Sequence, residues 1–123
     1  MAKKTEVKWL SEPEAHNYPA ALSYLCLIYD EQTAAHHVDN LKQAAMSQFK
    51  AKDIFRSSGL SLLGISNTHV QKNQQKIQAG TQLSPILLVR DPVNGKVIVA
   101  DGYHRLCAIY SYDEDADIPC KIV

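Results

Sequence analysis

The chain has 123 residues, of which 46% are hydrophobic and 21% charged, a composition typical of a globular domain with one core. Its 13 Lys and Arg residues balance 13 Asp and Glu residues, which excludes the overall positive field that would hold a nucleic-acid backbone. No segment approaches the roughly 20 apolar residues of a membrane span, and no signal-peptide segment follows the charged N-terminus, so we expect a cytoplasmic protein without membrane association.

The N-terminal part predicts a short strand followed by a helical hairpin. Residues 7–10 are a strand candidate, in which Trp9 is expected to anchor the core. A proline precedes the apolar run over 20–29, which predicts a helix buried on most sides. Asp30 or Thr33 can cap a second helix, whose small and apolar residues recur at helical spacing and allow close packing.

Two further helices are predicted in the middle of the chain. Residues 51–58 followed by Gly59 have the pattern of a short helix with a glycine stop. Asn67 or Thr68 can cap a helix over 70–78, also closed by a glycine. Between these helices, apolar residues are expected to carry the chain across the core: Leu60, Leu62, Leu63 and Ile65.

The C-terminal part predicts a β-hairpin, a helix and a final strand. The β-rich runs 85–90 and 96–100 flank a turn that contains Asn-Gly, a strong hairpin signal. The acidic run 113–117 is expected to be a solvated loop, because clustered like charges resist burial. Residues 118–123 predict a strand, and Pro119 indicates its start or a sheet edge.

The cysteines and the paired histidines do not indicate a metal centre. Cys26, Cys107 and Cys120 are far apart in apolar surroundings, as expected for reduced, buried thiols. His36 and His37 are adjacent on a predicted helix, where neighbours point about 100° apart, so they are poor joint ligands.

One corner carries the functional signal. The β-branched run before it stops at Asp101-Gly102, and a helical pattern begins at once. A strand that turns through glycine into a helix directs free backbone N–H groups and the positive end of the helix dipole at one spot, which suits phosphate. Arg105 could add a two-pronged contact, His104 could exchange a proton near neutral pH, and Asp101 could bind magnesium or a hydroxyl.

The same corner has an ordinary structural interpretation. Asp-Gly is a common turn, Asp101 can simply cap the helix, and Arg105 can be a surface charge. By itself the corner therefore does not establish a phosphate site.

From residue 67 onward, three features together resemble the ParB/sulfiredoxin fold. They are a helix that ends at a glycine and leads into Ser84-Pro85-Ile86, the turn Gly102-Tyr103-His104-Arg105, and the closing segment 118–123. They cover about half of the chain. The expected fold is therefore α+β, a small mixed β-sheet packed by helices, in one domain over 1–123. Within it, 67–123 forms the nucleotide- or phosphate-binding core and 11–66 a helical elaboration.

The resemblance implies binding of a nucleoside triphosphate, ATP or CTP, with Mg²⁺. Similar turns contact the phosphates, which assigns nucleotide binding to Gly102, Tyr103, His104 and Arg105, and a magnesium contact to Asp101. Sulfiredoxins add a lysine from the helix before the Pro-Ile strand. Here His69 stands at that place, with Lys72 one turn onward, so both are candidate nucleotide contacts.

The positions at which this chain differs from members of the family indicate which of the family's activities to expect. Sulfiredoxins place their essential cysteine inside the corner, where this chain has Tyr103, so sulfinic-acid reduction is disfavoured. Cys107 lies on the apolar side of the helix, as a core residue would. ParB-type DNA binding needs a helix-turn-helix domain after this region, and no direct DNA binding is expected. Asp101-Gly102-Tyr103-His104-Arg105 is most similar to a free-serine kinase branch.

The expected function is therefore binding of a nucleotide or phosphorylated small molecule, with small-molecule phosphotransfer as one outcome. Asp101 and His104 are the catalytic candidates, while Glu12, Glu14 and Asp53 are general-base candidates by position only. The alternative is a non-catalytic interaction or regulatory module, such as a toxin-antitoxin type partner that keeps the fold. The sequence leaves self-association into a homodimer open.

Overall fold

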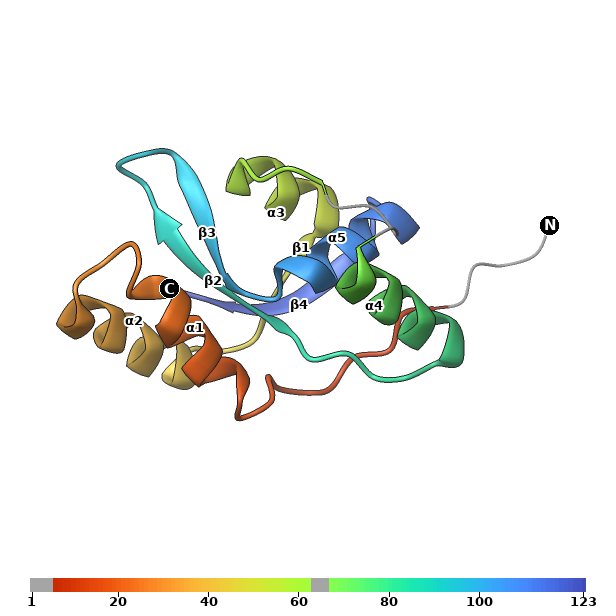
Figure 1. Cartoon of the computed structure of the whole chain (residues 1–123), viewed down its shortest axis with the longest axis horizontal. Helices are drawn as coiled ribbons and strands as arrows, with labels where there is room; N and C mark the ends of the chain where they lie inside the picture. The colour runs from red at the N-terminus through yellow and green to blue at the C-terminus, as the bar shows by residue number, and fades with distance from the viewer. Residues whose placement is uncertain (1–5, 63–66) are drawn as a thin grey trace.

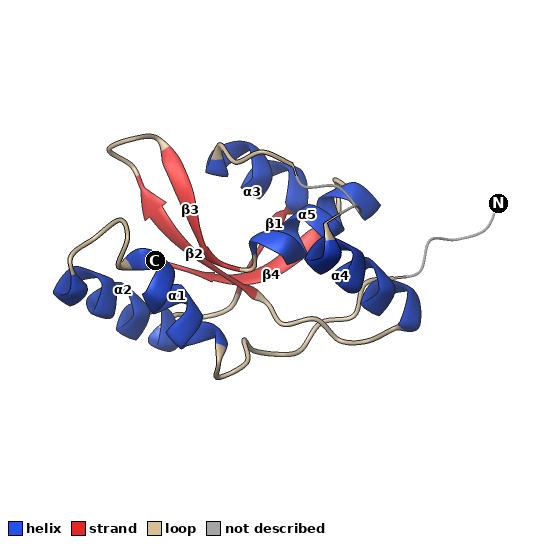
Figure 2. Ribbon diagram, in the orientation of Figure 1, coloured by secondary structure: helices blue, strands red, loops and turns tan. Residues whose placement is uncertain are grey.

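The computed structural model describes residues 6–62 and 67–123, and within them the chain folds into an α+β structure (Figures 1 and 2). In chain order the elements are α1 (Asn17–Leu25), α2 (Glu31–Gln43), β1 (Ser47–Lys50), α3 (Ala51–Ser58), α4 (Thr68–Ala79), β2 (Ile86–Asp91), β3 (Lys96–Asp101), α5 (Tyr103–Tyr112) and β4 (Asp117–Ile122). The predicted α+β class is confirmed.

A four-stranded mixed sheet in the order β1-β4-β2-β3 forms the centre of the molecule. β2 and β3 pair antiparallel as the predicted hairpin, with a register shift between Leu87 and Leu88. β4 runs parallel to β2 and antiparallel to β1. The parallel β2-β4 pair requires a crossover, which α5 provides on one face of the sheet.

Helices cover both faces of the sheet, as the ribbon in Figure 2 shows. On one face, α1 and α2 pack against Leu87, Val89 and Ala100. On the other face, α3, α4 and α5 pack against residues such as Leu88 and Ile118. β2 is buried from both sides, which explains why its apolar residues are continuous rather than alternating.

The helix caps follow the sequence signals. Asp30, rather than Thr33, caps α2 and accepts the backbone N–H of Thr33 at 2.8 Å. Asn67 caps α4, and Gly59 ends α3 in the left-handed conformation. The predicted helical hairpin of α1 and α2 is confirmed.

The prediction of a first helix buried on most sides was wrong. α1 ends at Leu25, and of its apolar run only Ala21 and Leu25 are fully buried. Leu27 lies beyond the helix and is 84% exposed. Cys26 is also exposed, so the expectation of buried thiols is confirmed only for Cys107 and Cys120.

Two core assignments also differ from expectation. Residues 7–10 form only one isolated bridge, Trp9 to Leu83, although Trp9 packs against the core as predicted. In the predicted core crossing, Leu60 is half-buried and Leu62 is 47% exposed. The other two residues of that crossing, Leu63 and Ile65, lie outside the described residues.

β1 was not expected, and its pairing with β4 means that Pro119 lies in an interior strand of the sheet. Of the two alternatives for Pro119, the sheet edge was therefore wrong; Pro119 lies near the start of the strand. The pairing with β2 begins only at Cys120, so at Pro119 the strand has β1 as its single neighbour. A proline is tolerated there because only one side of the strand needs hydrogen bonds.

The acidic segment after α5 is a surface turn, as predicted. Glu114 and Asp115 are exposed, and Asp115 forms an ion pair with Lys52 at 2.8 Å. Backbone hydrogen bonds from Ala51 and Lys52 fasten this turn to the start of α3. Over residues 6–62 and 67–123, none of the helices combines the length and hydropathy needed to cross a membrane.

Candidate functional site

The predicted corner between β3 and α5 is present and is built on Gly102. This residue precedes the first turn of α5 with φ of 106°, a conformation that glycine adopts without strain. A Cβ atom there would lie 2.4 Å from Ile86 Cγ2, so the backbone passes directly over β2. Glycine is therefore required both by conformation and by space.

The first turn of α5 has no side-chain cap. Gly102 cannot supply one, and within the described part of the chain no hydrogen bond satisfies the backbone N–H groups of Tyr103, His104 or Arg105. Most helices satisfy these groups with a Ser, Thr, Asp or Asn side chain. Here the first-turn donors lack such a cap.

Arg105 is engaged by protein groups next to the corner. Its Nη2 donates to Asp101 Oδ2 at 2.8 Å, and the two side chains are only 17% and 19% exposed. Its Nε is buried and has no partner among the described residues. The guanidinium thus connects the end of β3 to the first turn of α5 and is largely shielded from solvent.

Asn17, at the start of α1, extends this connection. Its amide nitrogen donates to Asp101 Oδ2 at 2.7 Å, and its oxygen accepts from Ser84 Oγ at 2.9 Å and from the Glu14 N–H at 3.2 Å. The opposite amide orientation would place two acceptor oxygens against each other. Asn17 is 2% exposed. A buried polar network therefore joins α1, the entry to β2 and the corner.

An open hollow lies beside this network. It has a volume of about 440 Å³ and is bounded by α1 through Ala20 and Tyr24, by Leu60, and by the corner itself. The corner contributes the continuous segment Val99 to His104. Asp101 and Gly102 thus face both the hollow and the network, whereas Arg105 does not line the hollow.

Two histidines meet at the corner, and one of them, His69, was a candidate only through the family resemblance. The rings of His69, on α4, and His104, on α5, lie 4.8 Å apart. Burial, together with the charge on His69, lowers the pKa of His104 below its usual value of 6.5. His104 is therefore mainly neutral at pH 7, so one ring nitrogen can donate a hydrogen bond and the other can accept one.

Tyr103 closes another side of the corner. Its hydroxyl donates a hydrogen bond to the carbonyl oxygen of Ser61. Burial is the main cause that raises the pKa of Tyr103 above 10.0, with nearby Cys107 adding to it. Tyr103 thus fastens the segment after α3 to α5 as a neutral donor.

The remaining candidates do not gather at the corner in the same way. Lys72 is exposed on α4, one turn beyond His69. Glu12 is exposed, and Glu14 contributes its backbone N–H to the Asn17 network. Asp53 lies on α3 and lines a different hollow. The structure therefore gives no carboxylate other than Asp101 among the residues lining the corner hollow.

Several residues of the site were not singled out by sequence. Asn17 and Ser84 look like ordinary turn residues, and nothing in the sequence indicates that they meet across 67 positions. Ala20, Tyr24 and Leu60 line the hollow although the sequence indicated core positions for them. The sequence locates the corner itself through its strand-Asp-Gly-helix pattern, but it contains no signal for the residues that surround the corner in space.

The residues present offer limited support for a metal ion. Among the described residues, no group of three or more His, Cys, Asp or Glu side chains is arranged to hold a metal. Asp101 uses Oδ2 for Arg105 and Asn17, which leaves Oδ1 without a hydrogen bond to the described residues. One free carboxylate oxygen could join a magnesium ion that is held mainly by phosphates.

Comparison with protein-family models, with curated proteins and with solved structures found no match for this chain.

Proposed function

We propose that this chain is a ParB/sulfiredoxin-like protein that binds the phosphates of a nucleotide or a phosphorylated small molecule at the amino end of α5. One observation carries the proposal: the uncapped first turn of α5 opens beside a hollow of about 440 Å³. Free helix N–H groups and the helix dipole together favour an anion at this position.

The surroundings of the hollow support a phosphate ligand. Gly102 lets the backbone approach a ligand closely, because it has no side chain. His104 lines the hollow as a neutral ring, and the single N–H of that ring can donate a hydrogen bond to a phosphate oxygen. The ring of Tyr24 and the side chain of Leu60 offer apolar contact for a base or another organic group.

In this proposal the main role of Arg105 is to hold the corner in shape, rather than to bind the ligand. Its guanidinium lies against the turn and is paired with Asp101, so its charge is partly neutralised. Direct contact with phosphate, as the resemblance implies, would use a guanidinium nitrogen other than Nη2 or would displace Asp101 from it. The Asp101–Arg105 pair holds Gly102 between two anchored residues and so keeps the first-turn N–H groups oriented.

Phosphotransfer is the narrower form of the proposal. Asp101 Oδ1 would hold a magnesium ion bound to the phosphates, and this ion would stabilise negative charge during transfer. The first-turn N–H groups would orient the phosphate, and His104 or His69 would hold or move a proton on an acceptor hydroxyl.

The alternative, a non-catalytic interaction module, is favoured by a different observation. The one arginine of the corner is already neutralised, while Tyr24, Leu27 and Ile28 expose apolar surface at and after the end of α1. Such surface is typical of a protein contact when it is contiguous. The two functions differ in whether nucleotide stabilises the fold.

Thermal unfolding with ATP, CTP, GTP and inorganic phosphate, each with and without Mg²⁺, tests the proposal. A ligand at 100 times its dissociation constant adds roughly 2.7 kcal/mol, which raises the Tm of a domain of this size by roughly 10 °C. Ala20→Phe fills the hollow from α1 and should abolish the shift. Ala35→Phe, at an exposed position of α2, should keep it. No shift with any ligand favours the interaction module.

A further inference from the structure

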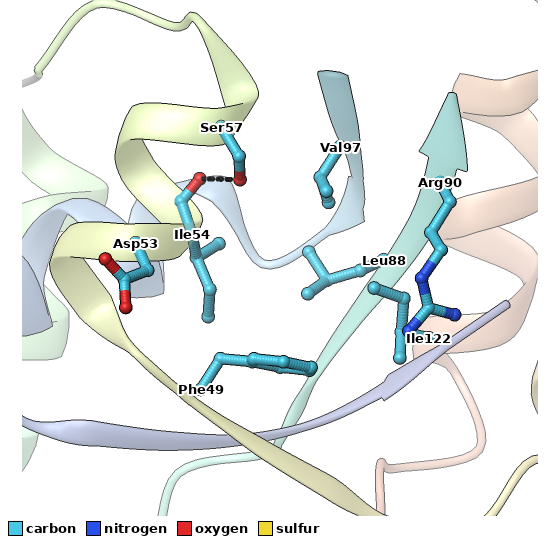
Figure 3. A pocket seen from close by; sticks show the side chains of 8 residues that line it. All are labelled: Phe49, Asp53, Ile54, Ser57, Leu88, Arg90, Val97 and Ile122. Carbon is cyan, nitrogen blue, oxygen red and sulfur yellow. Dashed lines mark hydrogen bonds between the residues drawn. The ribbon is translucent and has the colours of Figure 1, made fainter. Parts of the chain in front are cut away.

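A second hollow lies between α3 and the sheet, away from the corner. It has a volume of about 260 Å³, and Figure 3 shows the side chains that line it. None of these residues lines the corner hollow. The lining comes from α3 and all four strands: Phe49, Asp53, Ile54, Ser57, Leu88, Arg90, Val97 and Ile122.

The interior of this hollow is apolar. In Figure 3, Ile54 of α3 and Leu88 of β2 point toward the space between helix and sheet, and the ring of Phe49 lies below them. Phe49 is 38% exposed, unusual for a large aromatic residue that faces a sheet's packed side. Ser57 uses its hydroxyl within α3, donating to the Ile54 carbonyl at 3.0 Å. These surfaces can contact a small aromatic or branched group.

The rim carries opposite charges on its two sides. Arg90 extends from β2 on one side, and Asp53 lies in the first turn of α3 on the other (Figure 3). Both are exposed, and within the described part of the chain neither has an ion-pair partner. Arg90 stands two residues after Leu88 on β2, and both side chains line the hollow, so they project from the same face of the sheet. Arg90 is therefore an available anion-binding group beside an apolar hollow.

We infer that this hollow binds a small monocarboxylate with an aromatic or branched apolar body. The guanidinium of Arg90 would form a two-pronged hydrogen bond with the carboxylate, as arginine does with planar carboxylates elsewhere. The body would lie between Ile54 and Leu88 and contact the ring of Phe49. This pattern, an apolar cavity with one oriented polar group, is typical of small-molecule sites.

Size and charge restrict the ligand further. A volume of about 260 Å³ is just below the usual range for drug-sized ligands, so one ring or a short branched chain fits better than a nucleotide. Asp53 lies at the rim of the same hollow, so its negative charge would disfavour a second carboxylate on the ligand. The hollow should therefore prefer monocarboxylates over dicarboxylates.

NMR titration of the ¹⁵N-labelled full chain with benzoate, phenylacetate and 4-methylpentanoate tests this inference. Benzamide and phthalate serve as the neutral and dianionic controls. Ligands of this size should bind with dissociation constants of about 1 mM. Amide shifts should concentrate at residues 49, 54, 88 and 97, while the first turn of α5 should not move.

Three variants should change monocarboxylate binding in three different ways: one weakens it, one strengthens it and one leaves it unchanged. Arg90→Gln should weaken monocarboxylate binding by about tenfold or more, the value of a charge-assisted hydrogen bond. Asp53→Asn should strengthen it by about twofold, because a nearby like charge is removed. Lys96→Gln removes a cation from neighbouring β3, where the side chain lies near Gly59 and does not line the hollow, and should change nothing.

Binding of none of the three carboxylates at about 10 mM would overturn the inference. So would equal binding of benzamide, shifts confined to the corner, or an Arg90→Gln variant that binds as tightly as Lys96→Gln. Because the two hollows share no lining residue, failure of carboxylates to bind in this hollow does not argue against the nucleotide proposal.

Discussion

Replacement of Gly102 by alanine should destabilise the fold more than any other glycine-to-alanine change among the described residues. Two costs combine at this position. The φ of 106° is unfavourable for alanine, which costs roughly 1–3 kcal/mol. The new methyl group would also lie 2.4 Å from Ile86 Cγ2 and 2.8 Å from Arg105 Nη2, and such overpacking costs roughly 1–3 kcal/mol. We expect a total of about 3–4 kcal/mol, a large fraction of the stability of a small domain.

Urea unfolding followed by circular dichroism measures this loss, with unchanged m-values as evidence of two-state behaviour. Gly80→Ala is the matched control, because Gly80 also has a positive φ, 73°, but an added Cβ would meet nothing within 4 Å. It should cost only about 1 kcal/mol, the conformational cost without overpacking. Equal losses for the two variants would refute the argument that the corner is closely packed against Ile86.

Three further predictions concern polar groups. Asp101→Asn should cost about 2 kcal/mol in urea unfolding, because it leaves Arg105 partly buried without its anion. Asp115→Asn breaks an exposed pair of the same 2.8 Å length and should have little effect; similar losses would contradict the role given to burial. Because the pKa of His104 is lowered in the folded state, protonation favours the unfolded chain. Its stability contribution should be complete above pH 6.5 and decrease as the pH falls through that value, and His104→Gln should reduce this decrease in unfolding titrations between pH 8 and pH 5. A thiol reagent should label exposed Cys26 rapidly in the native protein but not Cys107 or Cys120, since burial raises the pKa of Cys120 to about 11; fast labelling that persists in Cys26→Ser would show that a buried thiol opens readily.

The sequence predicted the elements whose signals are local. The Asn-Gly turn located the hairpin of β2 and β3, and Asn67 and Gly80 bounded α4. Asp-Gly located the corner, where the chain does change from strand to helix. Each of these features depends on a few neighbouring residues, so a single sequence contains the information.

Features that depend on distant contacts were missed. β1 has the polar sequence Ser-Gln-Phe-Lys, and it is a strand only because β4 provides a partner 67 or more residues away. Because β1 lies beside β4, β4 is an interior strand, which the pattern around Pro119 did not indicate. The apolar run after Pro19 predicted burial, but α1 has only one covered side, and the rest of its apolar surface is exposed.

The candidate site shows the same limit. The residues of the corner were identified correctly as one local group, but the partner of Arg105 was not. Asp101 ends β3 and Arg105 lies in the first turn of α5, and the bend at Gly102 between them brings the two side chains together as readily as it aims Arg105 at a ligand. Asn17, which completes the network, comes from a segment 84 residues before Asp101, so only the fold could reveal it.

The backbone amides of the first turn of α5 provide the most direct test of the central claim. In an NMR titration of the full chain with ATP and Mg²⁺, and separately with CTP and Mg²⁺, we predict that the amide signals of Tyr103 and His104 shift most and saturate. Ala20→Phe should abolish these shifts. Saturable shifts located elsewhere, or none with either nucleotide, would contradict the assignment of this corner as a phosphate-binding site.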